Sequence, residues 1–204
     1  MWLPHKLEQQ VAILDAHPKA TLVLGATEYW QSWAGNSGSQ EQDIVQSPGV
    51  PANQVYEPPS LLNLLLKEAA CVACPSDLLF RKEAIANLGG FEQSFIGLFS
   101  IYEDQAFLAK VYANQPVFVS DQCLDRYRLH ADSICATTNR AGQLGKARIF
   151  FLNWTAEYLS SQRMLDADTR DLIRRQLWPH QHPVLHRLRQ LGPRVVKKLK
   201  RLRT

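Results

Sequence analysis

The stretch ATLVLGATEYW, residues 20–30, most constrains the fold of this chain. Its aliphatic and β-branched residues are typical of a buried strand. Leucine and valine recur at helical spacing over residues 3–14, just before it, and this helix should end before Pro18. Farther along the chain, strand-like and helix-like segments alternate. This alternation predicts an α/β fold in which helices pack in layers against a sheet.

The remaining segments show the same two periodicities. Residues 34–59 are rich in Gly, Ser, Gln, Asn and Pro and predict a long loop. Ser60 is placed to cap the helix that follows it, and glycine at the end of residues 81–90 is typical of a helix terminus. The expected helices cover residues 61–69, 81–90, 103–113, 140–161 and 167–177. The expected strands cover residues 71–80, 116–120 and 123–130.

Charge is distributed unevenly along the 204 residues. Residues 172–204 contain ten Lys and Arg and no acid, which leaves 13 basic and 19 acidic residues, net −6, in the rest. The hydrophobic content of 46% is ordinary for a globular protein. The sequence shows neither a signal-peptide pattern nor an apolar run of about 18 residues. These features predict a cytoplasmic protein.

A basic amphipathic tail is expected over residues 183–204, where Val and Leu alternate with Arg and Lys and Gly192-Pro193 interrupts the pattern. Such a segment suits the surface of an anionic membrane. It equally suits a solvated helix that packs one face on the domain. Nucleic acid is the least favoured partner, because the tail has no aromatic residue for stacking and the rest of the chain is acidic. The tail therefore predicts a peripheral position at the inner membrane face or a packing role.

The four cysteines comprise one close pair, Cys71 and Cys74, and two isolated residues, Cys123 and Cys135. A four-thiolate zinc site usually takes two close pairs. Because free cysteine tends to be buried, the sequence favours buried, reduced thiols over a metal site.

Two adjacent acids, Glu103 and Asp104, precede an apolar helical pattern. Acids in the first turn of a helix stabilise it by about 0.3–1 kcal/mol each. The same environment favours the ionised carboxylate, so an acid that also faces a cleft can act as a general base toward a hydroxyl. The turn at Gly89-Gly90 and the loop of residues 91–102 are candidates for the wall of such a cleft. Residue spacing leaves both interpretations open.

Three segments, in order along the chain, together resemble family 2 glycosyltransferases, which have the GT-A fold. WLPHKLEQQVAIL, residues 2–14, is similar to the segment that follows the Asp-x-Asp metal motif of that family. SDLLFRKEAIANLGGFEQSFIGLFSIYEDQAFLAKVY, residues 76–112, resembles the acceptor-side segment, in which a Gly-Gly-Phe turn precedes a Glu-Asp pair. YRLHADS, residues 127–133, resembles the Tyr-Arg-x-His-x-x-Ser segment.

The resemblance implies that a sugar is transferred from a nucleotide-sugar donor to a hydroxyl acceptor with inversion, in cell-surface polysaccharide or glycolipid synthesis. Asp104 would be the base that deprotonates the acceptor hydroxyl. Glu103 would orient the acceptor or line its site. The turn formed by Gly89, Gly90 and Phe91 would contribute substrate contacts.

The resemblance also implies a second group of site residues, close to the diphosphate of the donor. His130 would lie there as a metal ligand or hydrogen-bond donor, with Arg128 and Ser133 nearby. The cofactor of the complete enzyme would be a divalent cation, Mg or Mn, on the leaving group. Two structural interpretations stay open, because Arg128 could instead pair with Asp125 or Asp132, and His130 could be a structural residue.

The part of the family that binds the nucleotide has no counterpart here. No Asp-x-Asp precedes Trp2, and the later match, DADT at residues 166–169, is expected to cap a helix. The sequence therefore predicts an acceptor-side part of a GT-A-like domain over residues 1–135, a helical extension over 136–182, and then the basic tail.

Two function classes follow from this pattern. The chain could be the C-terminal part of an active transferase whose other half is encoded upstream or supplied by a second chain. It could instead be a non-catalytic remnant or a binding module that keeps the acceptor-side fold. In either case we expect the 204-residue chain alone to show no transferase activity, because nothing in it activates a donor. Met1 occupies a position that is apolar in the family, which favours a start inside a longer reading frame.

Overall fold

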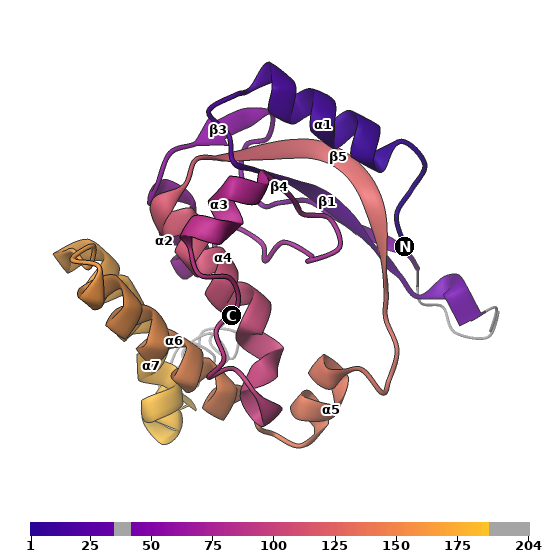
Figure 1. The fold of residues 1–204 in the computed structure, drawn as a ribbon. Helices are drawn as coiled ribbons and strands as arrows, with labels where there is room; N and C mark the ends of the chain where they lie inside the picture. The colour runs from indigo at the N-terminus through magenta and orange to yellow at the C-terminus, as the bar shows by residue number, and fades with distance from the viewer. Residues whose placement is uncertain (35–41, 188–204) are drawn as a thin grey trace, which may run out of the picture.

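The computed structural model describes residues 1–34 and 42–187, and Figure 1 shows a curled mixed sheet with helices on both faces. The sheet has the strand order β2-β1-β5-β3, and β4 pairs with β1 away from this path. The α/β fold predicted from the alternating segments is confirmed in this form. The strands are β1 Leu22–Trp30, β2 Ile44–Gln46, β3 Gln54–Tyr56, β4 Leu79–Phe80 and β5 Val117–Arg128.

Helices α1 and α4 cover opposite faces of the sheet. Val23 of β1 and Phe118 of β5 are buried with Leu14 of α1, whereas Leu22 and Val117, their neighbours along the strands, join the larger core that includes α4. This alternation is the two-residue period of a strand that is covered on both faces. The helices are α1 Lys6–Ala16, α2 Ser60–Leu66, α3 Lys82–Asn87, α4 Glu103–Asn114, α5 Ile134–Arg140, α6 Leu144–Ser161 and α7 Ala167–Gln181.

The C-terminal helices share the larger core. Phe151 of α6 and Ile173 of α7 are buried in one cluster with Leu61 of α2 and Phe107 of α4. Asp166 accepts a hydrogen bond from the backbone N–H of Thr169 at 2.6 Å and so caps α7. The interpretation of the DADT sequence as a helix cap is confirmed.

Strands β1 and β5 form the only parallel pair among the described strands. Their register begins at Leu22 beside Val117 and ends at Trp30 beside Arg128, with an irregularity around Gly25. A Cβ atom on Gly25 would lie 2.4 Å from the backbone oxygen of Gln122. Glycine therefore lets the two strands approach each other at the bulge.

We expect Gly25→Ala to lower the free energy of unfolding by about 1–3 kcal/mol, because a methyl group cannot fit against a fixed backbone oxygen. Urea denaturation of the purified protein measures this change. Gly145→Ala in α6 is the matched control, because its added methyl group would meet only the His180 side chain, at 3.3 Å. Equal stability of the two variants would contradict the prediction.

Several expected elements differ from those observed. The predicted loop over residues 34–59 contains the short strands β2 and β3, which exist because they pair with β1 and β5. The expected strand over residues 71–80 is wrong except for Leu79–Phe80. The two strands expected over 116–120 and 123–130 are one continuous strand, β5.

Helix boundaries also differ from those expected. The helix expected over residues 140–161 is interrupted, because α5 ends at Arg140 and α6 begins at Leu144. Ser60 begins α2 but does not cap it, since Pro59 is the N-cap residue and the Ser60 hydroxyl donates instead to the carbonyl of Glu57.

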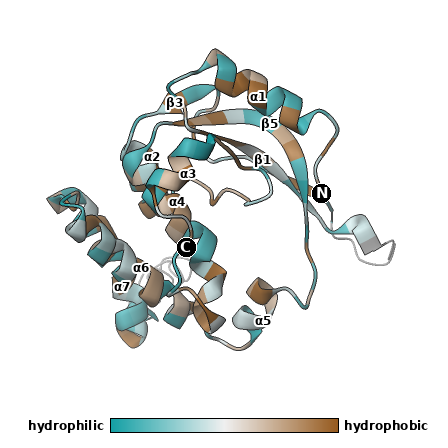
Figure 2. Ribbon diagram, viewed as in Figure 1, coloured by the Kyte–Doolittle hydropathy of each residue, from teal (hydrophilic) through white to brown (hydrophobic). Residues whose placement is uncertain are grey.

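Apolar side chains are exposed at two places on the sheet layer. Leu7 and Val11 lie on one side of α1, and Figure 2 shows hydrophobic as well as hydrophilic segments on this helix. Ile44 and Val45 are exposed on the edge strand β2. Among the helices of residues 1–34 and 42–187, none has both the length and the apolar character needed to cross a bilayer. The predicted basic tail lies from residue 188 onward outside the described residues.

Candidate functional site

A depression of about 450 Å³ lies at the carboxyl end of β5, beside the first residue of the chain. The first residues of the chain reach it by pairing with β5, since Leu3 donates its N–H to the carbonyl of Leu124 at 3.0 Å and Trp2 forms a bridge with Asp125. The residues that line the depression are Met1, Cys74, Pro75, Ser76, Arg126, Tyr127, Arg128 and His130. None of them is acidic and two are arginines, so the depression favours an anion.

The three residues of the YRLHADS segment have different roles. Arg128 and His130 line the depression and are exposed. Ser133 instead caps α5, because its hydroxyl accepts a hydrogen bond from the N–H of Ala136 at 3.2 Å. The suggested pairing of Arg128 with an acid is wrong for both candidates. Asp132 lies 3.9 Å from Arg140, and the buried Asp125 accepts a hydrogen bond from Ser76.

Arg128 is held by aromatic rings. Its Cζ atom lies 5.5 Å from the ring centre of Trp30 and 5.6 Å from that of Trp33. Trp30 is the cross-strand neighbour of Arg128. Trp33 lies in the 3₁₀ helix η1, Ser32–Ala34, and donates its indole N–H to the carbonyl of Leu129 at 2.9 Å. The end of the sheet therefore carries a cation held by two indole rings.

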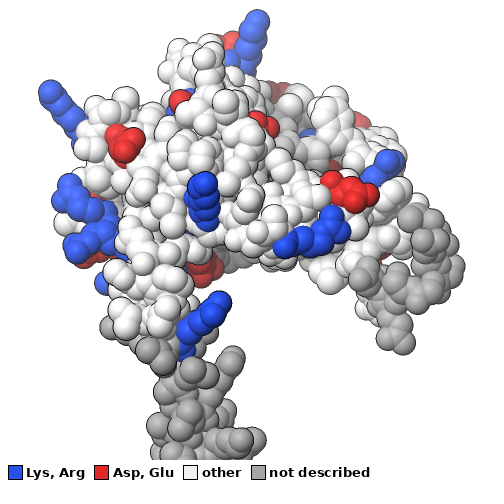
Figure 3. Space-filling view, turned by 90° about the horizontal axis from the view of Figure 1, so that it is seen from below, with Lys and Arg blue, Asp and Glu red and all other residues white. Residues whose placement is uncertain are grey.

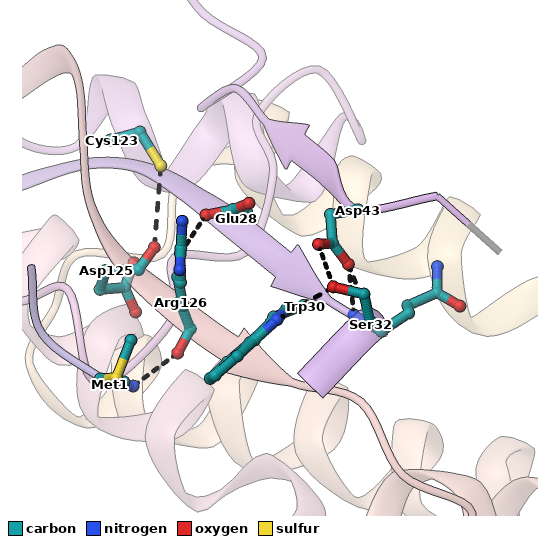
Figure 4. A network of polar contacts seen from close by, with 9 residues as sticks. Met1, Glu28, Trp30, Ser32, Asp43, Cys123, Asp125 and Arg126 are labelled. Atoms are coloured by element: carbon teal, nitrogen blue, oxygen red, sulfur yellow. Dashed lines mark hydrogen bonds and ion pairs between the residues drawn. The ribbon is translucent and has the colours of Figure 1, made fainter. Parts of the chain in front are cut away.

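A second arginine, Arg126, belongs to the same group (Figure 4). Its Nε atom donates to Glu28 at 2.5 Å, and its Cζ atom lies 5.5 Å from the ring centre of Trp30. The indole of Trp30 donates to the hydroxyl of Ser32 at 3.2 Å, and Asp43 accepts from that hydroxyl at 2.6 Å. Sequence reasoning missed Arg126, Trp30 and Trp33. The signals for them are arginines two residues apart at a strand end and the aromatic cluster YWQSW.

Asp104 lies in the first turn of α4 and is half-buried, whereas Glu103 is exposed. The Asp104 carboxylate accepts a hydrogen bond from the N–H of Gln105 at 2.6 Å. Burial nevertheless raises the pKa of Asp104, against this hydrogen bond, and the neighbouring charge of Glu103 acts in the same direction as burial. Burial therefore outweighs the opposing effect of the hydrogen bond at the helix end. A raised pKa is the direction that suits a general base.

Tyr127 lies between the two arginines on β5. Its side chain lines the depression, and its ring packs edge-on against Tyr29 with centroids 5.9 Å apart. Burial raises the pKa of Tyr127, and the charges of Cys135, Cys74 and Asp104 add to this rise. Its neighbours Arg126 and Arg128 point to the opposite face of the strand, because successive side chains alternate between the two faces.

The Gly-Gly-Phe turn is fixed to the acid-bearing helix. Gly89 and Gly90 have φ angles of 72° and 68°, a backbone conformation that residues other than glycine rarely adopt. Lys110 of α4 is buried and donates to the carbonyl of Gly90 at 2.5 Å and to the carboxylate of Glu92 at 2.6 Å. Phe91 is 60% exposed and stacks on Phe107, with ring centroids 4.8 Å apart. Phe91 is therefore available to a ligand.

The loop between this turn and the acids packs onto α6. Phe95 is buried and meets Phe150 and Trp154 edge-on, with centroids 5.1 and 5.3 Å apart. Phe99, in the 3₁₀ helix η2 Gly97–Tyr102, stacks on Phe150 at 3.9 Å. Ile96 is 72% exposed between these two anchors.

A buried polar cluster lies beneath the depression. Asp77 accepts a hydrogen bond from the backbone N–H of Gly25 and a longer one, 3.3 Å, from the amide of Gln10, and Gln10 in turn accepts from Lys6. Burial raises the pKa of Asp77 to about 6. Asp125 is fully buried, and its Oδ1 atom has no hydrogen-bond partner among the described residues. The cluster thus contains three ionisable groups that water does not reach.

The cysteines are not uniformly buried. Cys74 is buried and lies 3.0 Å from the hydroxyl of Ser76, Cys71 and Cys123 are half-buried, and Cys135 is exposed. The prediction of buried thiols is therefore wrong for Cys135. The thiols are free in this structure.

The depression does not fit a divalent cation. His130 is the one metal-binding imidazole in its lining, and the arginines beside it repel a cation. Magnesium and manganese prefer oxygen ligands, and no group of three His, Cys, Asp or Glu with ligand geometry occurs in the described part of the chain. We therefore assign no reaction step to a metal at this site.

Figure 3 shows charged side chains scattered over the face seen from below, with wide uncharged areas between them. Charged side chains on this face are therefore not gathered in one patch.

In comparisons with protein-family models, with curated proteins and with solved structures, nothing matches this chain.

Proposed function

We propose that this chain forms the acceptor side of a sugar-transfer site. In this proposal the curled sheet is the acceptor-side part of a GT-A-like domain of family 2 glycosyltransferases. The order of three segments in the sequence supports it: the opening WLP segment, the Gly-Gly-Phe turn with its acids, and YRLHADS. The nucleotide-sugar donor would be bound by groups outside this acceptor side.

Asp104 is the general base in the proposed reaction. It takes the proton of the acceptor hydroxyl while that oxygen attacks the anomeric carbon of the donor, and the bond from this carbon to the nucleotide diphosphate breaks. Attack from the opposite side inverts the anomeric centre. Glu103 orients the acceptor, and Phe91 offers it an apolar surface. Any divalent cation on the leaving diphosphate would be held outside the depression.

The observation that carries the proposal is the place of Asp104 in the fold. This half-buried acid lies in the first turn of α4, and Lys110 of the same helix holds the Gly-Gly-Phe turn, where Phe91 is exposed. Burial raises the pKa of Asp104, which suits a base that takes the proton of an acceptor hydroxyl.

A second candidate is a saccharide-binding module without catalysis. The exposed indole of Trp33 beside Arg128 favours it, because such a surface can hold a sugar without chemistry. The two candidates differ in whether Asp104 is needed after the ligand has bound.

Removal of the protein from its own cells tests the proposal. We expect one glycosidic linkage to disappear from a surface polysaccharide or glycolipid, and the reintroduced chain to restore it. Linkage analysis by methylation and mass spectrometry measures this change. An unaltered linkage profile in the deletion strain would refute a role in sugar transfer.

A further inference from the structure

The geometry points to an acidic saccharide as the ligand at the carboxyl ends of β1 and β5: a sugar that carries a carboxylate or a phosphate. This inference rests on the proposed function and deepens it by naming the class of acceptor. Four residues form the proposed subsite, here called the indole–guanidinium platform: Trp30, Trp33, Arg126 and Arg128.

The register of the two strands builds the platform. Glu28 lies beside Arg126, and Trp30 lies beside Arg128. Residues two apart on a strand point to the same face of a sheet. Both arginines therefore stand in one row on β5, and Trp30 stands beside them on β1. Trp33 completes the platform from η1.

The two guanidinium groups differ in what they have left to offer. Arg126 is already paired, since its Nε atom donates to Glu28 at 2.5 Å. Arg128 is exposed, donates no side-chain hydrogen bond to any described residue, and has no described carboxylate within 4 Å. Its position over two indole rings holds the guanidinium in place, while the N–H groups at its edge have no partner among residues 1–34 and 42–187. Such a group is prepared for bidentate binding of a carboxylate or a phosphate.

The indole beside it explains why the ligand should be a sugar and not a bare anion. Trp33 is 40% exposed, although its N–H is already bonded to Leu129. What it presents to a ligand is therefore an apolar ring face. A pyranose ring has an apolar C–H face of matching shape, and an aromatic surface with a few polar groups is the usual lining of a ligand site. A ligand with a sugar ring that stacks on Trp33 and an anionic group that binds Arg128 is an acidic saccharide.

Binding to the purified full-length chain tests the inference. The probes are a hyaluronan tetrasaccharide for the carboxylate, maltose phosphate for the phosphate, cellotetraose as the neutral saccharide, and uridine diphosphate for the nucleotide. Isothermal titration calorimetry and tryptophan fluorescence give the affinities. We expect at least one acidic saccharide to bind at least about tenfold more tightly than cellotetraose, as one charge-assisted bidentate contact provides, and to weaken as the salt concentration rises.

Variants connect this preference to the platform. We expect Arg128→Gln to remove the tenfold preference for the acidic saccharide. Arg174→Gln in α7 is the matched control, because this arginine is 76% exposed and lies outside the platform. Urea denaturation checks that Arg128→Gln folds. If it does not, Arg128→Lys keeps the charge but loses the planar fork, and it should still lower the preference several-fold.

The outcomes separate the inference from the proposed function. Equal binding of acidic and neutral saccharides by the wild-type chain would overturn the inference, and so would an acidic preference that survives Arg128→Gln. Tight binding of uridine diphosphate that is lost in Arg128→Gln, without an acidic saccharide preference, would also overturn it. The linkage profile of the deletion strain tests sugar transfer in every case, so the two can fail independently.

Discussion

Cells that carry Asp104→Asn in place of the wild-type protein are expected to lose sugar transfer by a factor of about 10²–10⁴. Asparagine has nearly the same shape as aspartate but cannot accept the proton of the acceptor hydroxyl. The missing linkage in the glycan of the complemented deletion strain, quantified by mass spectrometry, measures the loss. The fold should be retained, because the hydrogen bond from the N–H of Gln105 can still be accepted by the side-chain oxygen of asparagine.

The matched control for this variant is Asp168→Asn. Asp168 also lies in the first turn of a helix, α7, so it has the same relation to a helix end. If acids at helix ends act only on stability, both variants should complement equally well. Normal linkage levels with Asp104→Asn, together with retained saccharide binding, would favour the non-catalytic binding module.

The stability of the protein is expected to fall by about 2 kcal/mol between pH 4 and pH 7 through Asp77 alone. Burial raises the pKa of this carboxyl to about 6, with Asp125 adding to the rise and the Gly25 N–H and Lys6 opposing it. The folded protein therefore holds the proton more tightly than the unfolded chain, in which an aspartate titrates near 3.9. This contribution is complete below about pH 4 and is lost as the pH rises through about 6.

Urea denaturation at pH 4, 5, 6 and 7 measures this contribution as the difference between the wild type and Asp77→Asn. Asparagine resembles the protonated carboxyl and should remove the dependence, so its advantage over the wild type should grow by about 2 kcal/mol across the range. Asp121→Asn is the control, because Asp121 also lies in the sheet, on β5, but its side chain is exposed. A difference between Asp77→Asn and the wild type that stays constant with pH would contradict the prediction.

The core elements could be predicted from the sequence because each carries its own periodicity. The strand at Leu22–Trp30 and the helices at Lys6–Ala16 and Glu103–Asn114 begin and end within a few residues of the expected ranges. The three-residue strands β2 and β3 could not be predicted in this way. Ile44–Gln46 and Gln54–Tyr56 are too short to show a period, and they are held by pairing with β1 and β5.

The residues of the candidate site also differ in whether the local sequence could reveal them. Asp104 and His130 could be found because they belong to short segments with a recognisable order of residue types. The platform depends on register, which places Trp30 beside Arg128 although 97 residues separate them in the sequence. The pKa of Asp104 depends on burial, which overrides the local effect of the helix end. Neither register nor burial is encoded in residue spacing.

One pair of strands, β1 and β5, contributes both to the buried core and to the candidate site. The start of β5, from Val117 to Ser120, is buried in the core, and its last residues, up to Arg128, line the depression. The partner strand β1 runs in the same way from Leu22 to Trp30. The cooperative unit that holds the core in register is therefore also the unit that assembles the platform. Opening the core must separate Trp30 from Arg128, so the site and the fold are gained and lost in a single transition.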